Sequence, residues 1–396
     1  MSSTFGLVPR TRPNIERAAL VRSARVSEAD TVRRAAVALG LRSHTDHEHI
    51  GLTASGRGAL LALLETSGRS RAVIPGYTCK AVVEAAEIAG VQVDLVDVSD
   101  GYNWGPGDID RVAGPDAVVV LTHQYGIPCQ VENLAHSARS AGSLVLEDCA
   151  GALGGRWNGR PLGSFGDAAF YSFDMSKLVH VPPKGGALTI TDGGWADRAR
   201  RWLDRETHPM GPGRKAGSLA QAGILSAIGP RAYRLLHAIT LSARNRATTE
   251  APDLRVERDP FYDCQFAEWQ AEIAFPQLDA LDRLAADARG LYARYRDGLA
   301  GCRGIELPPP DERAEWAPIR FPVLVRGDKF AFYEQLLSRG VDCAFSFTHI
   351  ARPEELPRAR EIASRVLCLP FYPGLPEADA ERVIRVVHEV DSRWGG

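Results

Sequence analysis

The chain has 396 residues, of which 45% are hydrophobic and 24% charged, and its formal net charge is −2. This length exceeds one minimal core, so we expect a large and a smaller domain, and the near-neutral charge gives no reason to expect nucleic acid or an anionic membrane as a partner. The seven cysteines, an odd number without a Cys-x-x-Cys pair, fit neither a disulfide framework nor a zinc site, so we expect no bound metal.

Residues 1–50 form a polar, arginine-rich segment, in which a helix is predicted from about Ala29 to Leu39, with Gly40 as its end. No charged region followed by an apolar one precedes it, so no signal peptide is evident and we expect a cytoplasmic protein. The longest apolar-leaning stretch, Ala216 to Leu241, is interrupted by Gly229-Pro230 and by charged residues, and it cannot span a bilayer.

Short apolar runs alternate with helical patterns between Arg71 and Thr191. This alternation predicts an α/β fold with a mostly parallel central sheet that is flanked by helices. Ligands of such sheets bind beyond the carboxyl ends of the strands. The predicted strands are 72–74, 91–98, 117–122, 143–146, 168–173 and 186–191, and the predicted helices are 79–89 and 131–141.

The composition of the chain changes after Trp195, where charged residues become frequent. A long helical pattern then runs from Phe266 towards Leu299. A strand at 319–325 and helices at 329–338 and 378–390 then predict a smaller α+β unit. We therefore divide the chain into an N-terminal segment (1–50), a large domain (51–260) and a small C-terminal domain (261–396).

Asp148 ends a predicted strand, and Lys177 follows about thirty residues later, just after Ser172 at the end of the next strand. A pyridoxal phosphate (PLP) enzyme needs such a pair, because the lysine holds the cofactor aldehyde as a Schiff base and the carboxylate keeps the pyridine nitrogen protonated. Small residues after Asp148, including Gly151, let a flat ring approach the backbone. The alternatives are a capping aspartate, a solvated lysine, and Lys184 as the cofactor lysine.

The segment Ser55-Gly56-Arg57-Gly58 opens a predicted helix. Amide groups at such a helix start bind anions, so Gly56, Arg57 and Gly58 are candidates for the cofactor phosphate, with an ordinary N-cap as the alternative. Tyr77 follows a strand in a loop, where it either stacks on the cofactor ring or packs on a neighbouring helix.

These pieces in this order resemble the sugar aminotransferases of the DegT/DnrJ/EryC1/StrS family, which are fold type I PLP-dependent transferases. The resemblance covers about Leu52 to Val390 and implies that Lys177 binds the cofactor covalently and that Asp148 pairs with the pyridine nitrogen. It also implies that Ser172 and the amides around Arg57 and Gly58 hold the phosphate, and that the protein is a homodimer with active sites at the subunit interface. The matching stretches include Val73-Ile74-Pro75-Gly76-Tyr77-Thr78, Glu147-Asp148-x-Ala150, Gly163-Ser164-Phe165-Gly166-Asp167-Ala168, Ser172-Phe173-x-x-Ser176-Lys177 and Gly185-Gly186-Ala187.

Four positions depart from the family pattern. Gly151 stands where the family has Gln or His near the phenolic oxygen of the cofactor, and Arg57 replaces a threonine of the phosphate loop, where it can pair with phosphate directly. Asp263 replaces an asparagine that reaches the partner subunit's phosphate, and Cys79 replaces an aromatic residue. Because the cofactor lysine is retained as Lys177, the deoxygenating branch of the family is disfavoured.

We predict an aminotransferase that transfers an amino group from glutamate or glutamine to a keto sugar, which we expect to be nucleotide-linked, in natural-product or cell-surface sugar biosynthesis. Lys177 would move the proton between the donor's α-carbon and the cofactor. Gly151 and Asp263 leave open a PLP-dependent lyase, epimerase or bond-forming enzyme that acts on an amino acid or amine. A catalytically silent relative that serves as a binding or regulatory subunit is a further alternative.

Overall fold

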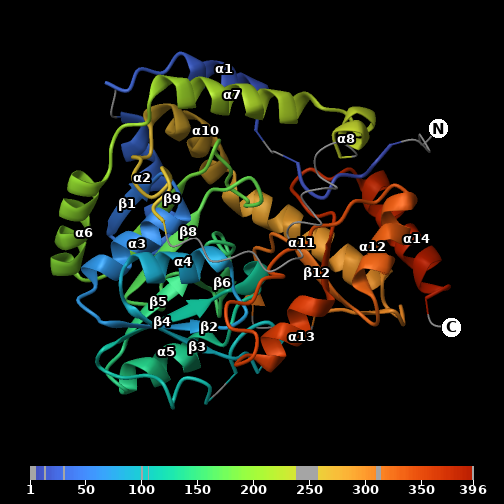
Figure 1. Cartoon of the computed structure of the whole chain (residues 1–396). Coiled ribbons are helices and arrows are strands. Elements are labelled where there is room, and N and C mark those ends of the chain that lie inside the picture. Colours follow the sequence, from blue (N-terminus) through green and yellow to red (C-terminus); the bar gives the residue numbers. More distant parts are fainter. Residues whose placement is uncertain are drawn as a thin grey trace.

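The computed structural model describes residues 6–12, 15–29, 32–99, 101–105, 107–237, 257–308 and 314–394. A seven-stranded sheet forms the centre of the larger part of the molecule, in the order β1-β9-β8-β5-β4-β2-β3 (Figure 1). The five strands from β8 to β3 are parallel, whereas β9 and β1 continue the sheet in antiparallel fashion. The strands are β1 (His49–Thr53), β2 (Arg71–Pro75), β3 (Gln92–Val96), β4 (Ala117–Thr122), β5 (Leu144–Asp148), β8 (Ala168–Ser172) and β9 (Gly186–Ile190).

Both faces of this sheet are buried at its middle strands, which explains why these strands have continuous apolar sequences. All six residues of β4 are buried, and its side chains alternate between two cores: Val118 and Val120 face one, and Val119 and Leu121 face the other. The α/β fold and the mostly parallel sheet that we predicted are therefore confirmed. The helices that follow or precede these strands are α3 (Gly56–Thr66), α4 (Lys80–Ile88), α5 (Val131–Ser140) and α6 (Gly193–Glu206).

The N-terminal helices pack on a helix from much later in the chain. Helix α1 (Arg17–Ala24) and helix α2 (Val32–Thr45) contact α10 (Glu268–Asp279), where Arg34 Nε lies 2.6 Å from Glu268 Oε1. The prediction that Gly40 ends the helix is wrong: α2 continues to Thr45, because Gly40 packs against Leu278 of α10 instead of turning the chain. Tertiary packing here outweighs the low helix propensity of glycine.

The apolar-leaning stretch that begins at Ala216 lies in α7 (Pro212–Ala227) and α8 (Pro230–Leu236), and its last four residues fall outside the described ones. Helix α7 lies beside α1, over α10 (Figure 1). No helix among the described residues is both long and apolar enough to cross a bilayer.

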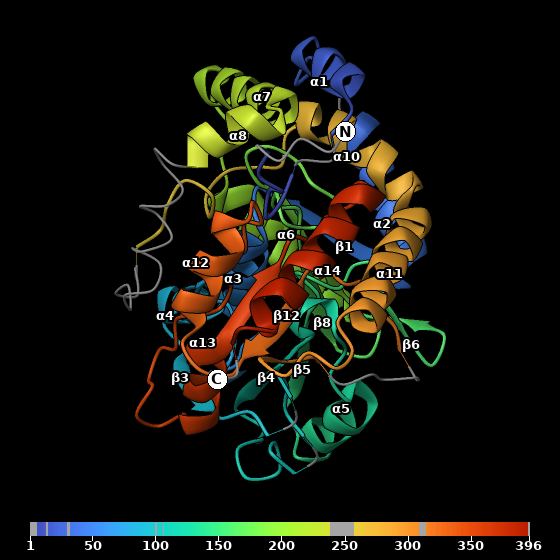
Figure 2. The same cartoon turned by 90° about the vertical axis from the view of Figure 1, so that its right-hand side faces the viewer.

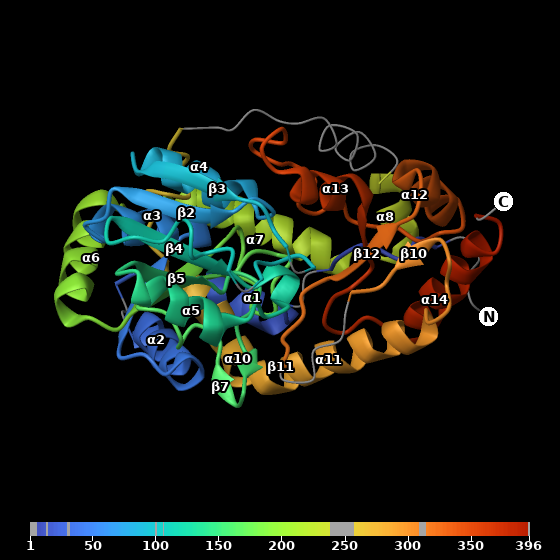
Figure 3. The same cartoon turned by 90° about the horizontal axis from the view of Figure 1, so that it is seen from below.

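A second, three-stranded antiparallel sheet forms the C-terminal part of the molecule, in the order β10-β12-β13. Helix α11 (Leu281–Gly298) runs from the larger sheet towards it (Figure 3), and α14 packs beside α11 (Figure 2). A small sheet of β6 (Arg156–Trp157), β7 (Arg160–Pro161) and β11 (Ala314–Glu315) also joins the two parts. The other C-terminal elements are β10 (Ile305–Glu306), β12 (Phe321–Val325), α12 (Lys329–Ser338), α13 (Pro357–Arg365), β13 (Val366–Leu369) and α14 (Glu377–Asp391).

Candidate active site

A cavity of about 380 Å³ lies at the carboxyl ends of β4, β5 and β8, where ligands of parallel sheets usually bind. Its floor and one wall come from the strand ends, from the start of α3 and from the loop after β8. The opposite wall comes from the C-terminal part of the molecule, through Ile319, Arg320 and the segment Phe345–His349.

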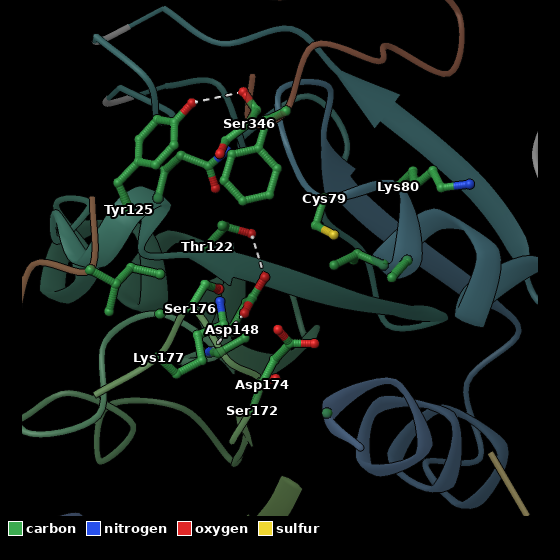
Figure 4. A pocket seen from close by; sticks show the side chains of 18 of the residues that line it. Cys79, Lys80, Thr122, Tyr125, Asp148, Ser172, Asp174, Ser176, Lys177 and Ser346 are labelled. Atoms are coloured by element: carbon green, nitrogen blue, oxygen red, sulfur yellow. Dashed lines mark hydrogen bonds between the residues drawn. The ribbon is translucent and has the colours of Figure 1, made fainter. Parts of the chain in front are cut away.

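Asp148 and Lys177 lie together in this cavity (Figure 4). Asp148 is the last residue of β5, and its carboxylate accepts hydrogen bonds from the amide of Ala150 at 3.0 Å and from the hydroxyl of Thr122 at 3.5 Å. Lys177 Nζ makes no hydrogen bond or ion pair with any of the described residues. Burial raises the pKa of Asp148 and lowers the pKa of Lys177, and each charge opposes the shift of the other.

The start of α3 and the end of β8 meet at another side of the cavity. A Cβ atom on Gly56 would lie 2.9 Å from Ser172 Cβ, so only glycine allows this approach. Ser55 caps the helix by accepting the Gly58 amide at 3.1 Å, whereas the amides of Gly56 and Arg57 have no hydrogen-bond partner among the described residues. The hydroxyl of Ser172 has no hydrogen-bond partner among the described residues.

Two cations lie beside this helix start. Arg57 Nη1 is 3.1 Å from Asp259, and its guanidinium lies over the ring of Tyr262 at 5.7 Å. Lys184 Nζ lies 4.9 Å from the ring centre of Phe261.

Lys177 and Lys184, the two candidate cofactor lysines, have different charged neighbours in the cavity. Burial lowers the pKa of Lys184, and the charge of Arg57 lowers it further, whereas Asp148 is one of the charges that act on Lys177. Of the two candidate lysines, the structure thus brings Lys177 to Asp148 and Lys184 to Arg57.

Three residues that we singled out from the sequence, Gly58, Tyr77 and Asp263, lie outside the lining of this cavity. The amide of Gly58, predicted to bind phosphate, instead donates to the hydroxyl oxygen of Ser55. Tyr77 is completely buried behind the cavity, where its hydroxyl is 2.6 Å from that of Tyr125 and its ring stacks on Tyr102. It is therefore not placed to stack on a ring held in the cavity, but it supports Tyr125, which lines it. Asp263 lies 3.9 Å from Arg258, and its buried Oδ1 has no hydrogen-bond partner among the described residues.

Gly151 lines the cavity, and the side chain of Ile319 occupies the space that a larger residue at position 151 would need. A Cβ atom on Gly151 would lie 3.0 Å from Ile319 Cδ1 and 3.4 Å from the amide nitrogen of Gly126. The space that a glutamine or histidine side chain would need at this position is therefore reduced by Ile319 from the C-terminal part.

Glu147, beside Asp148 on β5, holds the strand ends in place. Its carboxylate accepts the amides of Gly163, Phe165 and Gly166 at 2.8, 2.6 and 2.6 Å, and it lies 3.1 Å from His123 Nε2. Ligand atoms of His123, Glu147 and Cys149 lie within 4.8 Å of one another, as in some metal sites. Because both oxygens of Glu147 already accept two bonds each, the cluster is satisfied as a structural network.

The polar residues of the cavity wall that sequence reasoning missed include Gln124, Arg320 and His349. Gln124 Nε2 and both ring nitrogens of His349 are buried without a hydrogen-bond partner among the described residues. The signal for Arg320 was a charged residue within the predicted apolar strand 319–325. The signal for Gln124 was its place just after the predicted strand 117–122, at the strand end where ligands bind, whereas His349 belongs to no recognisable pattern.

Comparison with known proteins gives matches over nearly the whole chain. The sequence model of the DegT/DnrJ/EryC1/StrS aminotransferase family matches residues 19–388. The dTDP-3-amino-3,4,6-trideoxy-alpha-D-glucose transaminase of Micromonospora megalomicea subsp. nigra is 27% identical over 357 residues, which cover 85% of this chain and 83% of that one.

Solved structures share the fold at lower sequence identity. The crystal structure of the sugar aminotransferase CalS13 from Micromonospora echinospora matches with a TM-score of 0.74 and 22% identity, over 97% of this chain and 100% of that one. The PLP-form of Spr1654 from Streptococcus pneumoniae matches with a TM-score of 0.74 and 18% identity, over 98% of this chain and 100% of that one.

Proposed function

Since the chain belongs to the DegT/DnrJ/EryC1/StrS aminotransferase family, we propose that it uses PLP to transfer an amino group from glutamate or glutamine to a keto sugar. The observation that carries this proposal is the placement of Lys177 beside Asp148 in a cavity whose other side has unpaired anion-binding groups. The dTDP-linked sugar named for the Micromonospora megalomicea relative supports a nucleotide-linked acceptor.

The residues of the cavity fit this cofactor. The free amides of Gly56 and Arg57, the unpaired hydroxyl of Ser172 and the cations of Arg57 and Lys184 would bind the phosphate. Gly56 keeps this side open, because a Cβ there would meet Ser172. Asp148 would pair with the protonated pyridine nitrogen, which supplies the opposite charge that its buried carboxylate lacks.

Bound PLP supplies an electron sink for the electrons that remain when a substrate loses an α-proton. Lys177 would bind the cofactor aldehyde covalently and, when the substrate amine takes its place, hold and return the α-proton at Nζ. Burial lowers the pKa of Lys177, so that more of the amine is neutral at a given pH and able to accept a proton. The aromatic wall of Tyr125, Phe345 and Phe347 would exclude water from that proton transfer.

We also propose a homodimer in which the segment around Asp263 reaches the cavity of the partner subunit. Asp263 is outside the lining of its own cavity, and its pKa is raised by burial, which reduces the repulsion between this carboxylate and a phosphate. Sedimentation of the purified protein tests the oligomeric state. A monomer that binds PLP and is active would contradict this part of the proposal.

The test of the cofactor assignment compares two lysine variants. We expect Lys177→Ala to abolish the visible absorbance that borohydride bleaches, because no covalent bond to the cofactor can form. Lys184→Ala is the matched control, since Lys184 lines the same cavity beside Arg57; it should keep that absorbance and bind PLP more weakly. Absorbance that survives in Lys177→Ala would refute the assignment.

Gly151 and Ile319 favour one second candidate function, a PLP-dependent lyase, epimerase or bond-forming enzyme, because they change the cavity where the family has Gln or His. Product analysis separates the two functions. Formation of 2-oxoglutarate from glutamate together with an aminated sugar supports transamination, and consumption of an amine without an oxo acid product supports the second candidate.

A further inference from the structure

Arg320 is a cation of the cavity wall whose charge is not balanced inside the protein. It lies directly before β12, and its guanidinium makes no ion pair or hydrogen bond with any of the described residues. Other partly buried arginines are paired, such as Arg10, 2.7 Å from Asp342, and Arg71, 2.8 Å from Asp94. A guanidinium has five N–H donors, and those of the partly buried Arg320 have no partner among the described residues, so they are available to a ligand in the cavity.

The position of Arg320 separates it from the phosphate side of the cavity. The groups whose charges act on it include Asp174 and Tyr125, and its own charge acts on Lys177. The charge of Arg57 acts on Lys184, and Asp174 acts on both Lys184 and Arg320. Arg320 belongs to the C-terminal wall of the cavity, whereas Arg57 and Lys184 belong to the wall formed by the start of α3 and the loop after β8, where the phosphate is proposed to bind.

The anionic side chains nearest to Arg320 do not neutralise it. Asp174 lines the same cavity but makes no ion pair with Arg320. Gln124 adds an unused donor to this wall, because its buried Nε2 has no partner among the described residues. A group that satisfies this wall must therefore be an anion with acceptor oxygens, and it must come from outside the chain.

We propose that Arg320 binds a substrate carboxylate, through the planar fork of its guanidinium, on the Lys177 side of the cavity. This inference rests on the proposed function, in which the donor carries a carboxylate on the same carbon as the transferred amine. Two parallel N–H···O bonds to that carboxylate fix the donor's orientation, and the amine is then held near Lys177. A carboxylate on the acceptor sugar would satisfy the same chemistry.

Binding of a donor analogue to the PLP-loaded protein tests the inference. The probe is 2-methylglutamate, which has no α-proton to lose, and its Kd is measured by calorimetry and by the change in cofactor absorbance. We expect Arg320→Gln to raise this Kd by about 10- to 100-fold, the range for loss of charge-assisted hydrogen bonds, without loss of cofactor. Arg320→Lys, which keeps the charge but not the fork, should lie in between.

The control variant is Lys80→Gln, because Lys80 also lines the cavity but is paired with Glu84 at 3.1 Å; its Kd should match that of the unmodified protein. If Arg320→Gln changes only the KM of the acceptor in the second half-reaction, the carboxylate belongs to the acceptor. If neither the donor Kd nor the acceptor KM changes in either Arg320 variant, the inference is overturned. Failure of the unmodified protein to bind PLP would instead reject the proposed function.

Discussion

Gly151 and Ile319 should be energetically coupled, because they compete for the same space. A Cβ at position 151 would lie 3.0 Å from Ile319 Cδ1 and 3.4 Å from Ile319 Cγ1, so Ile319 must shift by a few tenths of an ångström. Overpacking of this kind costs about 1–3 kcal/mol, and we expect Gly151→Gln to fall in the upper part of that range. Ile319→Ala alone should cost about 2 kcal/mol, the lower end for such truncations, because one side of Ile319 already borders the cavity.

The double variant Gly151→Gln/Ile319→Ala measures the coupling. The glutamine side chain then occupies the volume vacated by the isoleucine, so the double variant should be at least about 1 kcal/mol more stable than the sum of the single changes. Urea midpoints of the cofactor-free proteins give these differences, after refolding has been shown to be reversible. Strictly additive midpoints would refute the conclusion that Ile319 takes the place of the larger residue.

Two further predictions concern the cofactor side of the cavity. Burial raises the pKa of Asp148, so the stability that its protonated form contributes is lost as the pH rises from the unfolded-state value, about 4, through the higher folded-state value. Asp148→Asn should therefore increasingly exceed the cofactor-free parent in urea midpoint as the pH rises above about 4, while failing to retain PLP, and parallel midpoints at all pH values would contradict this. Gly56→Ala should weaken PLP binding at least about 10-fold in a cofactor titration, since its Cβ would lie 2.9 Å from Ser172 Cβ and 3.2 Å from the Tyr171 carbonyl. Gly217→Ala, with open space around its Cβ, is the control, and equal PLP affinity in both variants would exclude the close approach as the cause.

The parts of the molecule that could be predicted from the sequence are those set by local pattern. The parallel strands β2, β3, β4, β5 and β8 are short, mostly apolar runs bounded by turn residues, and their carboxyl ends necessarily share one edge of the sheet. The neighbourhood of Asp148 and Lys177 follows from that geometry, because Asp148 ends β5 and Lys177 lies in the loop that follows β8. Strand β1 was not predicted, since its sequence His49–Thr53 is half-polar and only its pairing with β9 makes it a strand.

The remaining features depend on contacts between distant segments. No local pattern predicts whether the side chain of Tyr77 points into the cavity or into the core. Its contacts with Tyr102 and Tyr125 place it in the core. Similarly, Arg320 reaches the cavity only because the C-terminal sheet packs beside the larger one, more than a hundred residues away along the chain. Such long-range packing is what residue spacing alone does not encode.

The origin of the two cavity walls has a consequence for how this enzyme can diversify. The groups proposed to hold the cofactor come from residues 56–184, whereas the wall opposite them comes from residues 319–349. Substitutions in the later segment can therefore alter which molecule is recognised without disturbing the groups that perform the reaction. The reaction and the choice of substrate can therefore evolve separately in such an architecture, and new specificities can arise by changes confined to this short segment of the chain.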